Sequence, residues 1–261
     1  MQQRIALGIE YNGSRYCGWQ YQDHSPSVQE KVEQALSKVA NHPVRVSCAG
    51  RTDTGVHALG QVVHFDTQAI REDYAWMLGG NANLPDDITV LWAKPVSADF
   101  HARFSAIRRQ YRYVIFNRSQ RPAILAKRVS WEYRPLQLDR MTQAAEYLVG
   151  EHDFSSYRAL ACQAKSPVRT LHRLDIQHYG DIVTLDLEAN GFLHHMVRNI
   201  AGVLMKIGAG EAEPIWAQEV LEQRDRTQGG VTASPHGLYF VAACYPEHFS
   251  IPVLLPSAGV W

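Results

Sequence analysis

The chain has 261 residues, 46% of them hydrophobic, which is enough apolar material for one large domain or two smaller ones. Basic and acidic residues number 26 each, so attraction by net charge is excluded as the main reason for binding a nucleic acid. Four scattered cysteines without a CxxC pair, and the lack of a long apolar run or a signal-peptide pattern, predict a reduced, soluble, cytoplasmic protein without a membrane span.

The first part of the chain has a regular order of elements. Apolar residues alternate in its strands, and Ser27 with Glu30 forms a capping-box pattern that opens an amphipathic helix. In chain order we expect a strand at 4–11, a helix from 28 to 39, strands at 43–48 and 61–66, a helix at 70–80 and a strand at 88–96. This β-α-β-β-α-β order is typical of ferredoxin-like folds.

The second part repeats this order. We expect a strand at 109–116, a helix at 138–148 capped by Gly150, a hairpin of 171–178 and 181–188, a helix at 192–207 closed by Gly208, and a strand at 238–245. The prediction is an α+β protein with two ferredoxin-like (RRM-like) halves, whose mainly antiparallel sheets flank a central basic cleft. The halves are residues 1–104 and 105–247, followed by a C-terminal tail at 248–261.

Two stretches of the chain are basic and contain no Asp or Glu. They are residues 101–131 and 157–174. Such segments in a neutral protein indicate a localised anionic partner, but solvated strand edges and loops would explain them equally well. The candidates for phosphate contacts are Arg103, Arg108, Arg109, Lys165 and Arg169.

The most unusual local sequence lies between the second and third expected strands, at residues 49–58. It is longer than a hairpin needs, and it places Arg51, Asp53 and His57 among hydroxyl side chains. Gly50 and Gly55 permit positive φ and a close approach of the backbone to a ligand. Taken alone, an ordinary polar turn remains the better explanation.

Seven segments together carry a specific resemblance. They are Ala49-Gly50-Arg51-Thr52-Asp53 with Gly55-Val56-His57-Ala58, Tyr16-Cys17-Gly18-Trp19-Gln20, Asn81 to Pro85, Phe100 to Ala106, Tyr111-Arg112-Tyr113, His194 to Asn199, and Gly237-Leu238-Tyr239. In order and spacing this set, which covers nearly the whole chain, resembles the tRNA pseudouridine synthases that act on the anticodon stem-loop. Thr54 departs from the alanine expected there, but it is also small.

The resemblance implies that Asp53 is the catalytic nucleophile. Converting uridine to pseudouridine breaks the N-glycosidic bond, turns the base and joins its C5 to the sugar. A carboxylate can attack the base or the sugar, or promote a glycal intermediate, and the sequence does not choose among these routes. The reaction is an isomerisation without redox change, so no cofactor is expected.

The resemblance also implies roles for residues outside this loop. A carboxylate in a cleft that excludes water needs a nearby cation to stay ionised, and Arg198 is the family's pairing arginine. Tyr111 matches the active-site tyrosine that stacks on the target uracil, Arg51 the residue that wedges into the RNA, and Leu238 a residue that packs against the base.

The expected partners are tRNA, modified at positions 38, 39 and 40, and a second copy of the chain in a homodimer. A base in a paired stem cannot reach Asp53, so the target nucleotide must be flipped out. His194 and His195 are expected early in a helix, where adjacent side chains point apart, and with no HExxH or CxxC we expect no metal site.

Two other classes of protein remain as alternatives. A non-catalytic RNA-binding protein built on two RRM-like sheets would need exposed aromatic side chains but no Asp–Arg pair. A metal-dependent nuclease or deaminase would need a cluster of metal ligands, which the sequence does not show.

Overall fold

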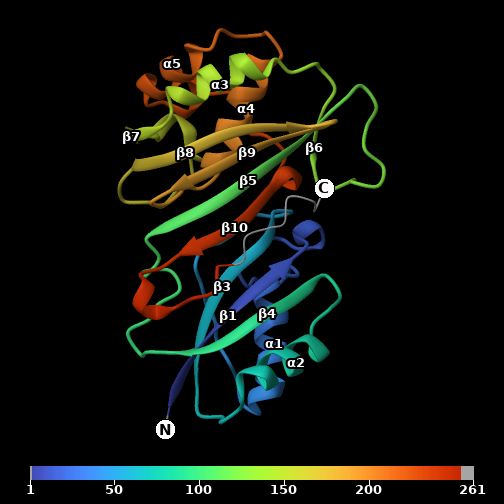
Figure 1. The fold of residues 1–261 in the computed structure, drawn as a ribbon, viewed down its shortest axis with the longest axis vertical. Coiled ribbons are helices and arrows are strands. Elements are labelled where there is room, and N and C mark those ends of the chain that lie inside the picture. Colours follow the sequence, from blue (N-terminus) through green and yellow to red (C-terminus); the bar gives the residue numbers. More distant parts are fainter. Residues whose placement is uncertain (1, 254–261) are drawn as a thin grey trace. The chain divides into compact units, whose positions relative to one another are not determined.

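Residues 2–253 are described by a computed structural model, and they divide into two units (Figure 1). The first unit contains residues 2–107 and, from Phe240 onward, the last part of the described chain; the second contains residues 108–239. From the sequence, the boundary was expected between residues 104 and 105, with residues 105–247 in the second half. The last strand instead crosses from the second unit into the first. Of the expected tail, residues 254–261 lie outside the described residues.

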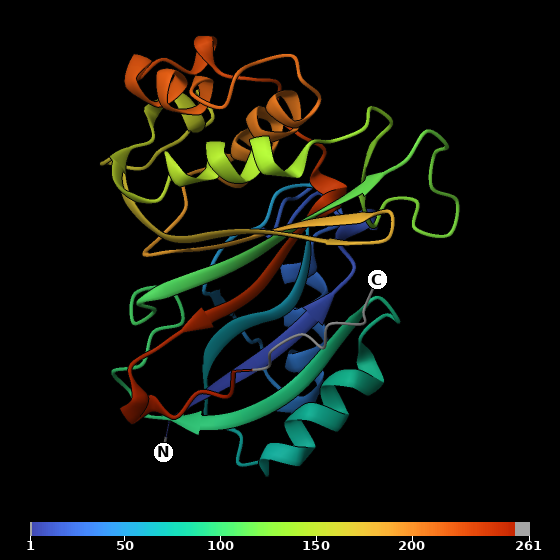
Figure 2. The ribbon, with the colours of Figure 1, turned by 45° about the horizontal axis from the view of Figure 1, so that its top comes forward.

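The first unit is a mixed α+β layer. Its elements are β1 (Gln3–Tyr11), α1 (Val28–Ala40), β2 (Ser47–Cys48), β3 (His57–Thr67), α2 (Asp73–Asn83), β4 (Ile88–Val96) and the part of β10 (Leu238–Cys244) that starts at Phe240. The sheet order is β4-β1-β3-β10, and β2 pairs with β3. Strand β1 pairs antiparallel with both β3 and β4, and β2 pairs antiparallel with β3. Helices α1 and α2 lie on one face of the sheet (Figure 2).

Two sequence signals explain the core of this unit. The alternation in β1 turns Ile5, Leu7 and Ile9 to a fully buried face. Ser27 caps α1 as predicted, because its Oγ accepts a hydrogen bond from the Glu30 amide at 3.2 Å. The result is a helix whose apolar stripe is fixed against the sheet.

The expected strand at 43–48 is wrong for most of its length, since only Ser47–Cys48 pairs. Pro43 has no amide hydrogen, and the amides of Val44 and Val46 donate to side chains of α1. Their acceptors are Ser37 Oγ at 2.9 Å and Glu33 Oε1 at 3.1 Å. The segment is therefore extended but tied to a helix instead of a neighbouring strand.

The second unit is also α+β. Its elements are β5 (Arg108–Asn117), β6 (Ser130–Glu132), α3 (Leu138–Glu146), β7 (Gly150–Asp153), β8 (Val168–Tyr179), β9 (Ile182–Ala189), α4 (Met196–Gly208), α5 (Trp216–Gln223) and the start of β10. The sheet order β5-β9-β8-β7 is antiparallel, and β6 runs parallel to β5. Helices α3, α4 and α5 lie on one face of this sheet (Figure 2).

Short 3-10 turns complete both units; they span Gly13–Arg15, Ser155–Tyr157, Arg226–Gln228, Pro235–Gly237 and Glu247–Phe249. None of the helices within residues 2–253 combines the length and the apolar character that crossing a membrane requires.

Three details of the second unit correct the sequence prediction. Helix α3 ends at Glu146, so Gly150, at φ +118°, begins β7 instead of capping the helix. Helix α4 begins at Met196 and not at residue 192, and the positive-φ glycine after it is Gly210 instead of Gly208. Strands β6 and β7 and helix α5 were not expected, because segments this short carry little periodicity.

His64 gives the first unit a measurable dependence on pH. This histidine on β3 is 6% exposed, and its Nδ1 accepts a hydrogen bond from the Ala102 amide at 3.1 Å. Burial, followed by the nearby His101 and Arg4 charges, lowers the pKa of His64 to about 4. The unfolded chain binds this proton near pH 6.5, so the native state should lose stability as the pH falls from about 6.5 towards 4.

Lowering the pH from 7 to 4.5 should reduce the free energy of unfolding of both the wild type and His64→Asn. We expect the loss to be larger in the wild type, by up to about 3 kcal/mol. The Oδ1 of asparagine can accept the Ala102 bond but does not titrate, so other acid-sensitive groups cancel in the comparison. Urea unfolding at both pH values measures the difference. Equal losses in the two proteins would contradict the assignment.

Candidate active-site elements

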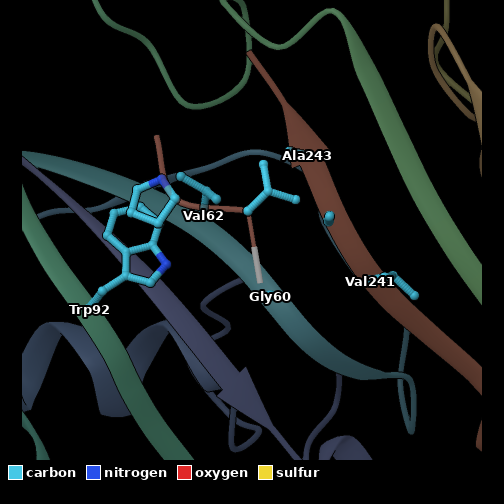
Figure 3. Close-up of a pocket in the computed structure, with 8 residues that line it drawn as sticks. Gly60, Val62, Trp92, Val241 and Ala243 are labelled. Carbon is cyan, nitrogen blue, oxygen red and sulfur yellow. The ribbon is translucent and has the colours of Figure 1, made fainter. Parts of the chain in front are cut away.

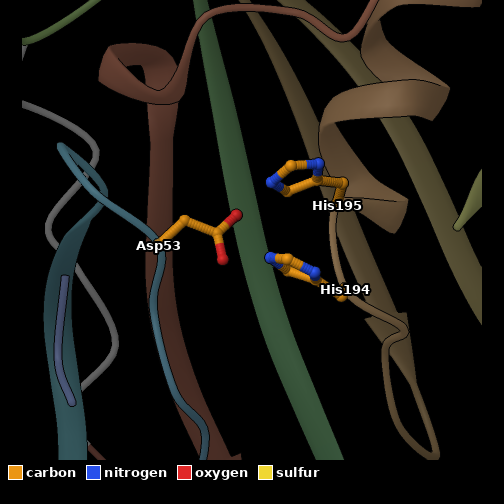
Figure 4. A group of neighbouring side chains, drawn as sticks. All are labelled: Asp53, His194 and His195. Atoms are coloured by element: carbon orange, nitrogen blue, oxygen red, sulfur yellow. The ribbon is translucent and has the colours of Figure 1, made fainter. Parts of the chain in front are cut away.

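Asp53 lies half-buried in the loop between β2 and β3 (Figure 4). The residue before it anchors this loop to the rest of the unit. This residue is Thr52, whose carbonyl oxygen accepts a hydrogen bond from the Trp19 amide at 3.0 Å. The Oγ1 of Thr52 lies 2.7 Å from the Tyr11 hydroxyl. Burial raises the pKa of Tyr11, which keeps its hydroxyl protonated and able to hold the loop. The backbone that carries the carboxylate is therefore fixed.

Gly18 makes this close packing possible. It has φ +93°, and a Cβ added to it would lie 2.7 Å from Thr52 O and 3.1 Å from the carbonyl carbon of Asp53. A Cβ on Gly13 would lie 1.9 Å from Val56 O at the other end of the loop. Two glycines from one segment thus let the chain pack directly on the Asp53 loop. Sequence reasoning assigned neither of them a role.

The base of the loop is closed by buried polar side chains. Gln61 is fully buried; its Nε2 donates to Gly50 O at 2.6 Å, and its Oε1 accepts from the Gly50 amide at 3.3 Å. His57 Nδ1 accepts from the Gly13 amide at 3.1 Å. His57 therefore has a structural role, whereas Arg51 is exposed and carries its charge at the surface.

Tyr111 on β5 is buried, and its ring packs edge-on against Phe192 at a centroid distance of 4.9 Å. Tyr113 lies two residues later on the same face of the strand. Its hydroxyl donates to Ser234 O at 2.8 Å, and burial raises its pKa. The hydroxyl of Tyr113 thus has a structural partner in the backbone.

Arg198 lies in the first turn of α4 and is half-buried. Its Nε donates to Ala233 O at 2.9 Å, and its own carbonyl oxygen accepts from the Ala233 amide at 3.1 Å. The loop that contains Ala233 packs closely on the helix at Gly202. A Cβ added to this glycine would lie only 1.9 Å from Val231 O. This loop therefore fixes the plane of the Arg198 guanidinium.

Asn199 holds that loop in place from the helix side. This residue is 2% exposed, and its Nδ2 donates to Tyr157 O at 2.7 Å. Its Oδ1 accepts from Thr232 Oγ1 at 2.7 Å and from the Arg226 guanidinium at 3.1 Å. All the bonds of the amide are internal, so we assign Asn199 to support of the loop that orients Arg198.

Asn199→Ala should lower the free energy of unfolding by about 2–3 kcal/mol, because the buried Tyr157 O and two half-buried donors, Thr232 and Arg226, lose their bonds at once. Asn83→Ala is the control: Asn83 is exposed at the end of α2, and its loss should change stability by at most about 0.5 kcal/mol. Urea unfolding compares the two variants. Equal stability losses would contradict the role given to Asn199.

His194 and His195 precede α4 instead of lying within it, and His195 has φ +63° (Figure 4). Their ring centroids are 4.1 Å apart. The expectation that the two side chains point apart is therefore wrong, because it assumed helical geometry. Two adjacent imidazoles are fewer ligands than a zinc site uses, so the pair alone does not define one.

Leu238, the first residue of β10, is buried directly after the turn Pro235–Gly237. The neighbouring Tyr239 donates its hydroxyl hydrogen to Arg128 O at 2.5 Å. The start of β10 is thus well fixed in the second unit.

The basic stretch at 101–131 is less positive in the structure than in the sequence. Strand β9 pairs with β5 and places acids beside its arginines. Arg112 forms a bidentate ion pair with Asp186 at 2.7 and 3.1 Å, and Arg108 lies 2.8 Å from Glu188. Arg109 donates to a backbone carbonyl at 3.1 Å. A run without acids in the sequence is therefore partly neutralised by its neighbouring strand.

Other predicted phosphate contacts lie at the surface. Arg103 is exposed beside Phe104, whose side chain is 76% exposed, with the guanidinium 5.6 Å from the ring centroid. Lys165 is also exposed. Arg169 is half-buried and donates to Ser166 O at 3.0 Å, so it is the least available of the three.

A pocket on the sheet of the first unit is not a candidate for acid–base chemistry (Figure 3). It is lined by Gly60, Val62, Trp92, Val241, Ala242, Ala243, Pro252 and Val253. None of these side chains titrates, so the pocket supplies neither a nucleophile nor a base.

Comparisons with known proteins show the family to which this chain belongs. The sequence model of the tRNA pseudouridine synthase family matches residues 8–105 and 144–246. A tRNA pseudouridine synthase A from Nitrosococcus oceani is 59% identical over 99% of this chain and 100% of its own. Those from Pseudomonas aeruginosa and Coxiella burnetii are 62% and 57% identical, over 95% of this chain and 88% and 95% of theirs. The chain therefore belongs to the tRNA pseudouridine synthase family.

Proposed function

We propose that this protein converts uridine to pseudouridine in the anticodon stem-loop of tRNA, at positions 38, 39 and 40, with Asp53 as the nucleophile. The observation that carries the proposal is the position of Asp53. It is a half-buried carboxylate in the segment that matches the family signature, on a loop tied to Trp19 and Tyr11. A nucleophile on a fixed backbone can meet the substrate without first being ordered.

The chemistry needs a nucleophile but no electron carrier. The bond between N1 of the base and C1′ of the sugar breaks, the base turns, and C5 bonds to C1′. C5 then loses its proton and N1 gains one, so the composition of the nucleotide is unchanged. Asp53 attacks the base or the sugar, or promotes a glycal, and holds the fragments while the base turns.

Four further residues act with Asp53 in this proposal. Arg198 supplies the cation that keeps the carboxylate ionised, with its guanidinium plane fixed by the bond to Ala233 O. Tyr111 stacks on the target uracil and takes part in proton transfer. Leu238 packs against the base, and Arg51 takes the place of the flipped nucleotide in the RNA.

Phosphate contacts complete the proposal. The residues are Arg103, Arg108, Arg109, Lys165 and Arg169. The exposed Arg103 supports such a contact most directly, whereas Arg108 would have to exchange its exposed bond to Glu188 for a phosphate. We further propose that the protein acts in the cytoplasm as a homodimer. A monomer seen by light scattering under assay conditions would contradict the dimer.

The test is to map pseudouridine at nucleotide resolution in unmodified tRNA incubated with this protein alone. Product at positions 38, 39 and 40 is the expected result, and it should persist in excess chelator because the isomerisation needs no metal. Absence of pseudouridine from these positions would refute the proposed substrate. Loss of activity on chelation that zinc restores would refute the metal-free mechanism.

A further inference from the structure

A second basic surface lies in the second unit, on residues to which the proposed function assigns no role. It consists of the loop 118–128 between β5 and β6 together with Trp131 and Tyr133, and we name it the β5–β6 surface. The loop extends outward from the end of β5 (Figure 2). It contains no Asp or Glu, and its four cations, Arg118, Arg121, Lys127 and Arg128, are all exposed. Unlike the arginines of β5, these residues do not lie in a paired strand.

Two aromatic side chains lie on the same surface. Trp131 is 43% exposed and Tyr133 62%, and their ring centroids are 6.1 Å apart. They alternate with the buried Ser130 and Glu132, so both rings emerge on one side of β6. Large aromatic rings are costly to expose, and a pair at one place indicates a binding surface.

Specific contacts join the aromatic and basic parts. Trp131 Nε1 donates to Arg118 O at 2.9 Å, and the Arg118 guanidinium lies 4.4 Å from the centroid of Phe116. The Arg118 ion pair with Asp181, at 3.4 Å, joins two exposed groups and is weak enough to exchange for another anion. Glu132 is already neutralised by Arg134 at 2.6 Å.

We propose that the β5–β6 surface binds RNA, with its cations on phosphates and Trp131 or Tyr133 stacked on an unpaired base. This inference rests on the proposed function, which supplies an RNA substrate. Proteins bind single-stranded or looped RNA through this combination of aromatic rings and neighbouring cations. A twofold contact between two copies of this surface would place cations against cations, so RNA fits it better than a second copy of the chain.

The cations are tested by the salt dependence of binding. Arg118→Gln/Arg121→Gln should weaken binding to unmodified tRNA about tenfold and reduce the slope of log Kd against log salt by about 1 to 2. Lys38→Gln/Arg71→Gln removes the same charge from exposed positions of the first unit and should leave the slope unchanged. Equal slopes in the wild type and the Arg118/Arg121 variant would overturn the phosphate contacts.

The aromatic part is tested at constant charge. Trp131→Phe and Trp131→Leu both lose the bond to Arg118 O, but only phenylalanine retains a ring for stacking. We expect Trp131→Leu to bind tRNA at least about fivefold more weakly than Trp131→Phe, with the same salt slope. Equal affinities would overturn the stacking contact.

Two further outcomes separate this inference from its alternatives. Altered oligomeric state in light scattering, with unchanged tRNA affinity, would assign the surface to a protein contact and overturn the proposal. If the wild type makes no pseudouridine but binds tRNA with the predicted salt slopes, the proposed function fails and the RNA surface stands. Activity in the wild type with unchanged binding in all variants would refute the surface alone.

Discussion

Asp53→Asn should abolish pseudouridine formation while the protein still binds tRNA. The amide has nearly the same shape as the carboxylate but lacks its charge and nucleophilicity, so we expect the single-turnover rate to fall on the order of 10⁴-fold or more. The loop should keep its conformation, because Thr52 holds it through bonds to Trp19 and Tyr11. Affinity for unmodified tRNA should therefore remain within about threefold of the wild type.

Asp23→Asn is the matched control, since it makes the same chemical change at an exposed position of the first unit and should leave the rate unchanged. Single-turnover assays and tRNA titrations on the three proteins separate chemistry from binding. Unaltered product formation by Asp53→Asn would remove the proposed nucleophile. A wild type that binds tRNA and forms no product would instead favour the non-catalytic RNA-binding alternative.

Much of the α+β fold could be predicted because its longer elements carry strong periodicity. The bounds of β4 agree with the prediction, and β1 and β5 agree to within one residue at either end. The prediction failed at 43–46, where amide hydrogens bond to Ser37 and Glu33 on α1. Alternation of apolar residues indicates that one face of a segment is buried. It does not indicate which group accepts the hydrogen bonds of the segment's backbone amides.

Charge was harder to predict than fold. A stretch of sequence without acids is positive in space only when its neighbours also lack acids. The antiparallel register of β5 and β9 places Asp186 opposite Arg112, and that register joins residues more than seventy positions apart. By contrast, no strand pairs with the loop 118–128, and its Arg118 meets Asp181 only in an ion pair of two exposed side chains at 3.4 Å. The loop therefore keeps more of the positive charge that its sequence suggested.

The candidate site was proposed from resemblance, and its structural support could not be predicted. The signature around Asp53 singled out the loop, but periodicity gave no sign that Gly18 packs against it, because the two segments are far apart in the sequence. The remaining signal was Gly18 itself, a glycine beside a tryptophan in a segment with no regular period. Asn199 belongs to the resembling segment His194 to Asn199, but periodicity gave no sign of its supporting role, since a polar residue in an amphipathic helix is expected to face solvent.

Gly18→Ala should reduce both stability and activity. The added methyl would lie 2.7 Å from Thr52 O, and the φ of +93° is unfavourable for alanine. Because both obstacles are in the backbone, the Asp53 loop must move to relieve the contact. A displacement of about 1 Å at a reacting group can cost about 10²-fold, so we expect a fall of that size in the single-turnover rate. The free energy of unfolding of Gly18→Ala should be about 2–4 kcal/mol lower than that of the wild type.

Gly180→Ala separates the two causes. Gly180 also has positive φ, +59°, but a Cβ there meets no atom within 4 Å, so alanine adds only backbone strain. We expect it to lose about 1 kcal/mol of stability with no change in rate. If Gly18→Ala behaved like Gly180→Ala, contact with the Asp53 loop would not matter for catalysis. If it lost activity at temperatures where both variants remain folded, the cause would be a displaced carboxylate, because no charged or hydrogen-bonding group has been removed.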